Sequence, residues 1–451
     1  MKTTLCRVIL AAAALFAAAG TTQLRAQQDG PGQVLTLDLD SALEIALSDN
    51  PTILSADMEI ERFDWVRRET IGNHLPSLSA GGQYSFSIVK QEMTKGLSLG
   101  ADMSAAITGD LSIPLVVPAV YASLRLNRTQ QALAVEQARS SRIELTNSVT
   151  KSFFQILLLE RSYEVLRESE RTIRATVDNT RSMFEAGLAS EYDFLTAEVQ
   201  LSNLQPSLIN TANSIVVAKR MLKMYLSVPE EVEIALDGSL DDYMGEVLSV
   251  PDPSASLDGN TDLRQMEYQQ TMLQQQIRLA NAARLPVLAG YGSLVVTGQD
   301  KTIDFAGMMT GGGGTINKWW WQKPFSAGFQ ISVPIFSGLK NTSKVKQLRN
   351  SVAQVEMQKG YLREAKGLEA RTAVNNLVSA RETMTANDKT VAQAEKAYSI
   401  ARTRFDAGAG TMLEVNQAQL AVTQSRLNLS QAVYDLLAAR ADYDKIIGSD
   451  N

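Results

Sequence analysis

The sequence predicts a mainly α-helical protein with a transmembrane β portion, built by duplication of a unit in which a helix, a strand hairpin and a long helix follow one another. A stretch that occurs twice indicates the duplication: Phe184–Val199 aligns without a gap with Phe405–Leu420, 221 positions later (405 − 184). Each copy lies between two long segments with helical periodicity, so each is predicted to be the turn of a helical hairpin. A period-two alternation in residues 97–113 marks the clearest strand.

Residues 1–26 have the pattern of a secretory signal. A basic start precedes the unbroken apolar run Val8–Ala19, and Leu24–Ala26 offers a cleavage site. Cys6 is the only cysteine, so the exported chain is expected to hold no disulfide, thiolate nucleophile or cysteine metal site. No later segment has about 18 consecutive apolar residues, so no membrane-spanning helix is expected. A chain that crosses a membrane without one must do so as a closed β-barrel.

The first repeat covers residues 27–226. The capping-box pattern Ser41–Glu44 opens a helix that Pro51 interrupts and that resumes to about Gly72. Large apolar residues in the long helix recur at intervals of 3, 4 or 7, as in a coiled coil. Pro206 is expected to kink or break the last helix of the repeat. The other predicted elements are strands at 77–89 and 97–113 and helices at 119–186 and 191–226.

The strand predicted at 97–113 separates two kinds of side chain. Its large apolar residues occupy odd positions, such as Leu99 and Ile107, and its charges occupy even positions, such as Asp102 and Asp110. A strand of a soluble sandwich fits this alternation. However, strands of this length with small polar residues on the second face are more typical of a barrel wall between lipid and water.

An acidic linker, residues 227–260, is expected to form a small lateral, or equatorial, element between the repeats. The second repeat, residues 261–451, then follows the plan of the first. Pro76 corresponds to Pro286 at an offset of 210. The elements predicted here are a first helix, strands at 287–297 and 325–335, and helices at 339–407 and 411–447.

The predicted lengths suggest how the helices pack. The helices at 41–72 and 191–226 are together as long as the helix at 119–186. Two short helices stacked end to end could therefore line one long helix along its whole length.

Each chain supplies only four strands, which would leave a sheet with two unpaired edges. In lipid each unpaired backbone group costs several kcal/mol, and four strands are too few to enclose a pore. Copies must therefore share a barrel, and two copies would give 8 strands (2 × 4) and three would give 12 (3 × 4).

These features together resemble the TolC-type outer-membrane efflux ducts, the outer membrane factor family, over essentially the whole mature length. The resemblance rests on the duplicated plan and on the turns F-E-A-G and F-D-A-G, with Asp193 or Glu414 six residues after each glycine. It implies a homotrimer with a 12-stranded barrel in the outer membrane of a Gram-negative bacterium, on a long α-helical coiled-coil barrel that forms a periplasmic tunnel. It also implies a periplasmic adaptor and an inner-membrane pump as partners.

The function that the resemblance implies is a passive exit duct of a tripartite efflux or type I secretion system. Such a duct conducts small molecules, ions or polypeptides that the pump expels. The alternative is a periplasmic or surface coiled-coil structural protein without a pore, which would have no use for the strand at 97–113.

The two turns are predicted to form the tips of the tunnel and to contact the adaptor. Gly187 and Gly408 also have a structural role, because glycine tolerates the positive φ that ends a helix. The residues predicted to dock the adaptor are Phe184, Gly187, Leu188, Ser190, Phe405, Gly408, Ala409 and Thr411.

Asp193, Glu414 and Gln417 are the candidate gate. Three copies of Glu414 could form an acidic ring that favours cations at the constriction. The alternative is helix capping, because Ser190–Asp193 and Thr411–Glu414 are both helix-start patterns. Family ducts often carry a second acidic residue at the position of Gln417, and an aromatic hydroxyl where Phe405 lies, so a single acidic ring without that hydroxyl is expected.

Other residues point away from catalysis. The net charge of −6 argues against nucleic acid, and one histidine, His74, makes no metal site. The sequence has no nucleotide-binding glycine fingerprint, so no enzymatic activity, cofactor or metal is expected. Trp319–Trp321, with Tyr84 and Phe86, are predicted to form either an interfacial aromatic belt or part of a core.

Overall fold

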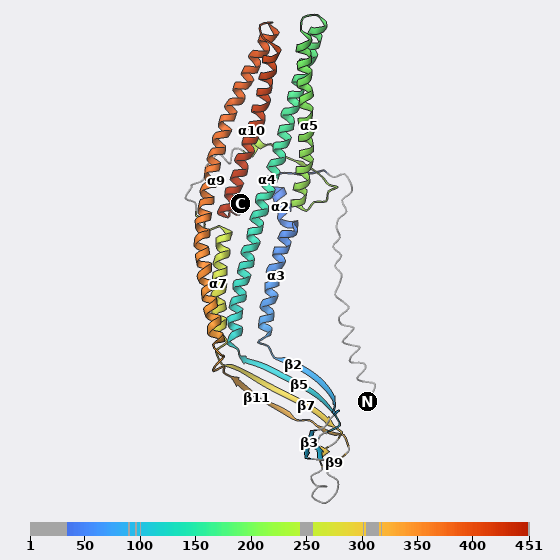
Figure 1. Cartoon of the computed structure of the whole chain (residues 1–451), viewed down its shortest axis with the longest axis vertical. Helices are drawn as coiled ribbons and strands as arrows, with labels where there is room; N and C mark the ends of the chain where they lie inside the picture. Colours follow the sequence, from blue (N-terminus) through green and yellow to red (C-terminus); the bar gives the residue numbers. More distant parts are fainter. Residues whose placement is uncertain are drawn as a thin grey trace, which may run out of the picture.

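A long helical rod carries a curved β-sheet at one end and two helical hairpin turns at the other (Figure 1). This computed structural model describes residues 34–88, 91–94, 97–99, 101–243, 256–300, 302–303, 315–316 and 318–449. The predicted signal at 1–26 lies outside these residues, as does the middle of the predicted linker. Among the described helices, none combines the length and the apolar composition that a membrane span requires.

Two helices run most of the length of the rod. They are α4, Pro118–Glu185, and α9, Lys340–Asp406. Each continues through a tip into a 36-residue helix, α5 (Glu191–Leu226) or α10 (Met412–Ile447). The break expected at Pro206 is not present, because α5 is helical throughout. Gln205, beside this proline, donates from Nε2 to Oε1 of Glu170 on α4 at 3.1 Å and so holds α5 against its neighbour.

The first helix of the sequence is interrupted at Pro51, as expected, and forms two helices, α2 (Leu39–Asp49) and α3 (Pro51–Gly72). Its start lies at Leu39, two residues before the expected Ser41. Asn50 separates them and caps α3, since its side chain accepts a hydrogen bond from Thr52 N at 2.8 Å. Its Nδ2 also donates to Tyr225 O in the last turn of α5 at 2.7 Å. Only α3 therefore continues α5 end to end, whereas α2 packs beside the junction against α4 and α5.

The second repeat contains the same junction. Helix α7, Thr261–Ala282, begins after Asn260, whose Oδ1 accepts from Leu263 N at 3.1 Å. Its Nδ2 donates to Ile446 O in the last turn of α10 at 2.7 Å. The two asparagines are buried and are 210 positions apart (260 − 50), as the repeat requires. We call Asn50 and Asn260, with the helix ends that they bridge, the asparagine joints.

Four antiparallel strands form the sheet, in the order β2, β5, β7 and β11. The short strand β10 (Trp320–Gln322) pairs with the far end of β7. Short hairpins, β3 (Gln91–Thr94) with β4 (Leu97–Leu99) and β8 (Thr302–Ile303) with β9 (Thr315–Ile316), lie beyond it. The four main strands are β2 at Ser77–Phe86, β5 at Met103–Val116, β7 at Val287–Gln299 and β11 at Phe325–Ser332.

The long strand expected at 97–113 is wrong in its bounds. Residues 97–99 belong to β4, and the sheet strand β5 starts at Met103 and continues past Pro114 to Val116. Asp300 explains the start, because its Oδ1 accepts hydrogen bonds from the backbone N–H of Asp102 at 2.8 Å and of Met103 at 3.1 Å. The alternation in the sequence continues through this corner and so conceals it.

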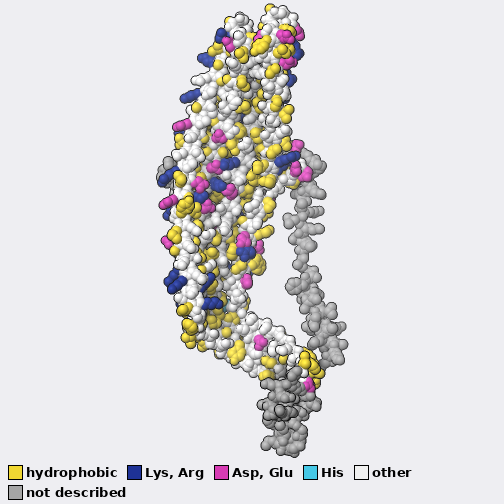
Figure 2. All heavy atoms as spheres, in the orientation of Figure 1, with side chains coloured by type: hydrophobic (Ala, Val, Ile, Leu, Met, Phe, Trp, Pro, Cys, Tyr) yellow, Lys and Arg dark blue, Asp and Glu magenta, His cyan; other side chains and the backbone are white. Residues whose placement is uncertain are grey.

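The strand register places residues of similar polarity on the same face in all four main strands. Leu78, Leu111, Gly292 and Ala327 form one cross-strand row. The next row, which faces the other side, is Ser79, Asp110, Ser293 and Ser326. Because side chains alternate along each strand, the sheet has one apolar and one largely polar face. Figure 2 shows charged side chains along the rod and few on the sheet.

The described part of the linker lies at the level of the joints. Strand β6 (Glu233–Leu236) pairs in parallel with β1 (Val34–Leu37), and the 3-10 helix η1 covers Leu240–Tyr243. Tyr243 packs edge to face on Phe154, with ring centroids 5.2 Å apart. The main core cluster lies here, around the fully buried Phe153, and ties the linker to α4.

Candidate functional site at the helical tips

Both tips reverse the chain with a glycine at positive φ. Gly187 has φ of 75° and Gly408 has φ of 72°. The N–H of the following residue, Leu188 or Ala409, donates to the carbonyl of Met183 at 2.7 Å or of Arg404 at 2.8 Å. These bonds satisfy carbonyls in the last turn of α4 and α9, so the glycines have the helix-ending role that their position predicts.

The first tip has a complete capping box. Ser190 Oγ accepts from Asp193 N at 3.2 Å, and Asp193 Oδ2 accepts from Ser190 N at 3.3 Å and from Ser190 Oγ at 2.6 Å. The carboxylate of Asp193 is therefore already hydrogen-bonded to Ser190 at the start of α5. Of the two interpretations of Asp193, the geometry in this chain supports helix capping.

The second tip differs at the matching residue. Thr411 Oγ1 accepts from Glu414 N at 3.3 Å, which caps α10. The Glu414 carboxylate instead lies 3.8 Å from Nη1 of Arg404, at the end of α9. Arg404 also donates from Nη2 to Ala409 O at 3.2 Å, so it connects both sides of the turn. Sequence reasoning missed Arg404, although a basic residue in the last turn of a helix is a known favourable placement.

The aromatic residues of the two tips have different neighbours. Phe184 stacks on Phe194 with centroids 6.1 Å apart and an interplanar angle of 6°, and Arg181 lies 5.4 Å from the Phe194 centroid. Phe405 packs against a cluster that joins the two hairpins below the tips. That cluster consists of Ile173, Val177, Ala197, Met412 and Val415.

Seven of the predicted docking residues are exposed at the tips: Phe184, Gly187, Leu188, Ser190, Gly408, Ala409 and Thr411. Phe405 is half-buried in the cluster below the tips. Gln417 is exposed one turn into α10. The structure adds Tyr192 and Leu195, exposed apolar residues in the first turns of α5 that sequence reasoning did not select.

The aromatic residues of the sheet lie near its far end. Tyr84, Ala105, Gly298 and Trp321 share one row of the apolar face, and Trp319 stacks on Trp321 with centroids 5.8 Å apart. All three aromatic residues are exposed, which favours the belt over core packing. Trp320, next in sequence, falls on the opposite face.

His74, the one histidine of the sequence, lies away from the tips. His74 lies edge to face on Tyr121 at the sheet end of the rod, with centroids 5.6 Å apart. Over the described ranges, no group of three or more His, Cys, Asp or Glu side chains could hold a metal ion.

Sequence comparison identifies the family. A family model described as "Outer membrane efflux protein" matches residues 42–227 and 253–449, one span in each repeat. The chain belongs to the outer membrane efflux protein family. The family membership sets aside the alternative of a coiled-coil structural protein without a pore.

Two curated relatives show the range of this family. The alkaline protease secretion protein AprF of Pseudomonas aeruginosa is 26% identical over 420 residues, 90% of this chain and 83% of AprF. The outer membrane protein TolC of Vibrio cholerae is 22% identical and covers 67% of each chain. A protein named for secretion is thus similar to a chain whose family is described by efflux.

Solved structures have the same fold. CusC superposes with a TM-score of 0.74 at 16% identity, over 94% of this chain and 95% of CusC. The open state of MtrE of Neisseria gonorrhoeae superposes with a TM-score of 0.71 at 17% identity, over 91% and 88% of the two chains. These structures show that the fold is shared. Through its family, the chain is an outer-membrane efflux channel.

Proposed function

We propose that three copies of this chain assemble into one duct, in which twelve strands close a cylinder and the helical rods surround a tunnel. The observation that carries this proposal is the pair of free sheet edges. In the strand order of the described sheet, β2 is the last strand at one edge and β11 at the other. Unpaired backbone groups at such edges favour pairing with another chain, and copies of one chain supply matching edges.

The tips are the proposed contact with a periplasmic adaptor, and through it with an inner-membrane pump. Seven of the eight predicted docking residues are exposed there, and Tyr192 and Leu195 extend the apolar area along α5. Exposed apolar residues that gather at one end of a molecule are typical of a partner interface. The duct itself is a passive, non-catalytic conduit, so its cargo is whatever the pump delivers.

Glu414 is the proposed gate residue, with Arg404 as its modulator. The pair lies within a tip, and both side chains are about half exposed. Around a threefold axis three such pairs would present alternating charge, so Arg404 would weaken the cation preference that three glutamates alone would have.

Light scattering of the detergent-solubilised protein tests the assembly. We expect the protein to be recovered in the outer-membrane fraction. After solubilisation, the protein part of the particle should have the mass of three chains. A monomer that stays in solution without detergent would overturn the proposal.

Pull-down of envelope proteins tests the tip contact. The variant Leu188→Asp should lose an adaptor that the wild-type chain retains, and the matched variant Val135→Asp, at an exposed apolar residue of α4 far from the tip, should retain it. Equal recovery with the Leu188 variant would place the adaptor elsewhere.

A further inference from the structure

The sheet end of the rod carries basic residues at equivalent positions of the two repeats. Helices α4 and α9 end 221 positions apart (406 − 185), and neither is interrupted, so this offset holds along both. It pairs Arg125 with Lys346 (346 − 125) and Arg128 with Arg349 (349 − 128). We call these four residues the basic collar. Because equivalent residues occupy the same face of their helices, the collar lies on one side of the wall that the helices form.

A contact beside each half of the collar supports this equivalence. On α4, His74 lies edge to face on Tyr121, with ring centroids 5.6 Å apart. On α9, Arg284 donates from Nη2 to Thr342 Oγ1 at 3.2 Å. Thr342 lies 221 positions after Tyr121, and Arg284 lies 210 positions after His74, which is the offset between α3 and α7 (261 − 51). The two repeats therefore match in space one helical turn from the collar.

The segments that carry the collar have no acidic residues. Residues 118–135 contain two arginines and no Asp or Glu, and residues 340–355 contain three lysines, one arginine and no Asp or Glu. The whole chain, by contrast, has a net charge of −6. All four collar residues are exposed, and none of their side chains has a hydrogen bond or an ion pair with any residue that the structure describes. Their charges are thus available to a partner.

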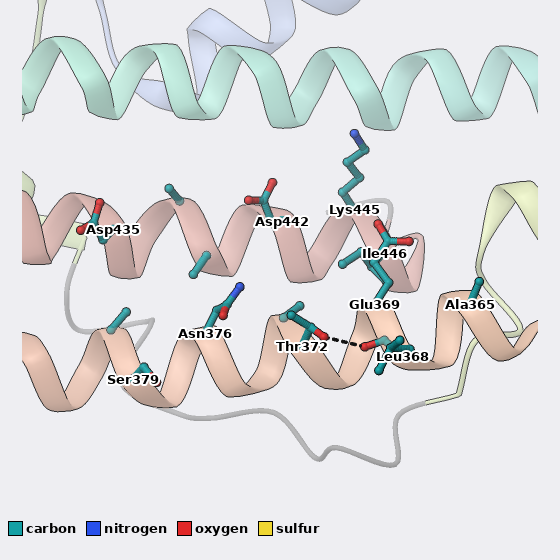
Figure 3. Close-up of a pocket in the computed structure, with 14 residues that line it drawn as sticks. Ala365, Leu368, Glu369, Thr372, Asn376, Ser379, Asp435, Asp442, Lys445 and Ile446 are labelled. Carbon is teal, nitrogen blue, oxygen red and sulfur yellow. Dashed lines mark hydrogen bonds between the residues drawn. The ribbon is translucent and has the colours of Figure 1, made fainter.

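Elsewhere the rod carries charge of both signs. The last turns of α3 contain Asp64 and Glu69 among three arginines. On the α9 side, Figure 2 shows both signs along most of the rod and only Lys and Arg close to the sheet. Farther from the sheet, a groove of about 830 Å³ between α9 and α10 is lined by three acidic and one basic side chain (Figure 3), namely Glu369, Asp435, Asp442 and Lys445. Basic charge without acidic neighbours is therefore a property of the sheet end.

The linker covers one face of α4. Eighteen residues make five turns of an α-helix, so Tyr121, Arg139 and Leu157 lie on one line along this helix. Arg139 donates from Nη1 to O of Gly259, in the linker, at 3.0 Å. Leu157 lines a groove together with the linker helix η1. This line of α4 thus contacts the linker at two levels.

The collar lies on that same face. Arg128 is seven residues from Tyr121, which places it within about 20° of the line. A linker that joins the two repeats of a tunnel wall must run outside the wall, because three copies of it inside would obstruct the tunnel. The collar therefore faces away from the tunnel, on α4 directly and on α9 by equivalence.

Exposed apolar residues occupy the junction between the sheet and the collar. Ile335 and Phe336, between β11 and α9, are 94% and 80% exposed, and Tyr121 is 54% exposed one turn before Arg125. Apolar residues, then an amphipathic aromatic ring, then basic residues is the order expected at a membrane interface. Arg128 lies about 15 Å along α4 from its first residue, and a long basic side chain can extend from there toward lipid headgroups.

We propose that the basic collar binds anionic phospholipid headgroups in the leaflet of the outer membrane that the rod adjoins. The partner carries a net negative charge, as phosphatidylglycerol does, because a zwitterionic headgroup has no net charge to attract the collar. Three copies of the chain would place twelve basic residues (3 × 4) around the duct. The inference rests on the proposed function, in that the sheet must lie in the membrane, and it adds the lipid class and the residues that hold it.

Native mass spectrometry of the full-length protein in non-ionic detergent tests the lipid preference. The probes are phosphatidylglycerol and phosphatidylcholine with identical acyl chains, added in equal amounts. We expect the wild-type duct to retain more phosphatidylglycerol, since each basic residue near an anionic surface strengthens binding about fivefold. Lys346→Gln with Arg349→Gln should lower the retained phosphatidylglycerol by about half, because the α4 pair remains. Adding Arg125→Gln and Arg128→Gln should bring it down to the phosphatidylcholine level.

Lys340→Gln with Lys344→Gln is the matched control. Both lysines lie at the level of the collar, but they are about 180° and 140° around α9 from Arg349. Their equivalents on α4, Ala119 and Ser123, are uncharged. This variant also removes two positive charges, and it should retain as much phosphatidylglycerol as the wild type. Equal losses in the two paired variants of α9 would show that net charge alone attracts the lipid and would overturn the collar.

Reversal potentials in a bilayer of phosphatidylcholine test which side of the wall the collar faces. Substitution of all four collar residues should leave the reversal potential in a salt gradient unchanged. A shift toward cation selectivity would place the collar inside the tunnel and overturn the lipid site. A wild-type duct that light scattering finds trimeric but that shows no preference for phosphatidylglycerol would overturn it too, whereas a monomer would overturn the proposed function as well.

Discussion

At the scale of single residues, neighbouring charges decide what an acidic side chain can do. Glu414 and Asp193 occupy the same position of the two repeats, and the sequence predicts the same alternatives for both. The structure separates them, because Asp193 turns back to Ser190 and Glu414 lies near Arg404. The sequence could predict that both residues start a helix. It could not predict the difference, which depends on a side chain across the turn.

Removing Arg404 should therefore strengthen the cation preference of the duct. In Arg404→Ala the Glu414 carboxylates lose their nearest positive charge, so reversal potentials in a salt gradient across a planar bilayer should shift toward cation selectivity. The effect on stability should be below about 1 kcal/mol, because the pair is exposed.

Arg402→Ala is the matched control for that measurement. Arg402 pairs with Asp406 at 3.9 Å on the same turn of α9, so the variant removes one positive charge without exposing Glu414. Glu414→Gln should shift selectivity the opposite way. Equal shifts in the two arginine variants would show that net charge matters and the pair does not.

Glu170 should make the rod sensitive to acid. Burial alone would raise its pKa, but hydrogen bonds from Gln205 and Arg167 and the charges of Arg167 and Arg174 outweigh burial and hold the pKa below its ordinary value of 4.5. A lowered pKa stabilises the fold above pH 4.5, and this contribution is lost as the pH falls through the folded-state pKa. Glu170→Gln should lower the melting temperature at pH 7, and the gap to wild type should narrow below pH 4.5.

An exposed pair on the same helix provides the comparison. Glu164 lies 3.3 Å from Arg161 and both are exposed, so Glu164→Gln should leave the melting temperature nearly unchanged at either pH. A gap between Glu170→Gln and wild type that does not change with pH would contradict ionisation as the cause.

At the scale of elements, periodicity predicted most of the fold and side-chain contacts determined the rest. The regular spacing of apolar residues predicted the bounds of α4 and α9 to within a residue or two of those observed. Pro51 allowed the sequence to predict an interruption of the first helix, but only the bond from Asn50 to Tyr225 shows that α3 is the helix that continues α5. Similarly, the corner at Met103 depends on Asp300, almost 200 positions away in the sequence.

The tip glycines should be costly to replace. Both have φ above 70° and open space where a Cβ would lie, so Gly187→Ala or Gly408→Ala should lose about 1–2 kcal/mol through backbone strain alone. Gly360→Ala is the control, since this glycine lies within α9 with equally open space and should gain about 1 kcal/mol from helix propensity. Thermal melting by circular dichroism would rank the three variants. A tip variant as stable as the α9 variant would contradict the strain.

At the scale of the whole molecule, the described sheet ends in a strand without a partner at each edge. The apolar face of that sheet carries Tyr84 and Trp321 in the open. The sequence predicted the four strands and the need for copies to share them.

The assembled duct should migrate differently on a gel before and after heating. Unheated samples in mild detergent should run near three times the mass of one chain, which is 49.2 kDa before any processing, and boiled samples should run as a single chain. A closed cylinder pairs every backbone group of its strands, so we expect strand pairing between copies to persist in mild detergent until the sample is heated. A single band at monomer mass under both conditions would contradict a shared sheet.

The asparagine joints also affect how such a chain can change length. In an unbroken helix one inserted residue rotates everything beyond it by about 100°. At a joint a new helix begins with its own cap, so the rotation stops there. Insertions in α3 or α7 would thus leave the orientation of α5 and α10 unchanged. Helices α4 and α9 are continuous, so an insertion in either would rotate the rest of that helix. Natural length variation among related ducts should accordingly fall on the jointed side of each repeat.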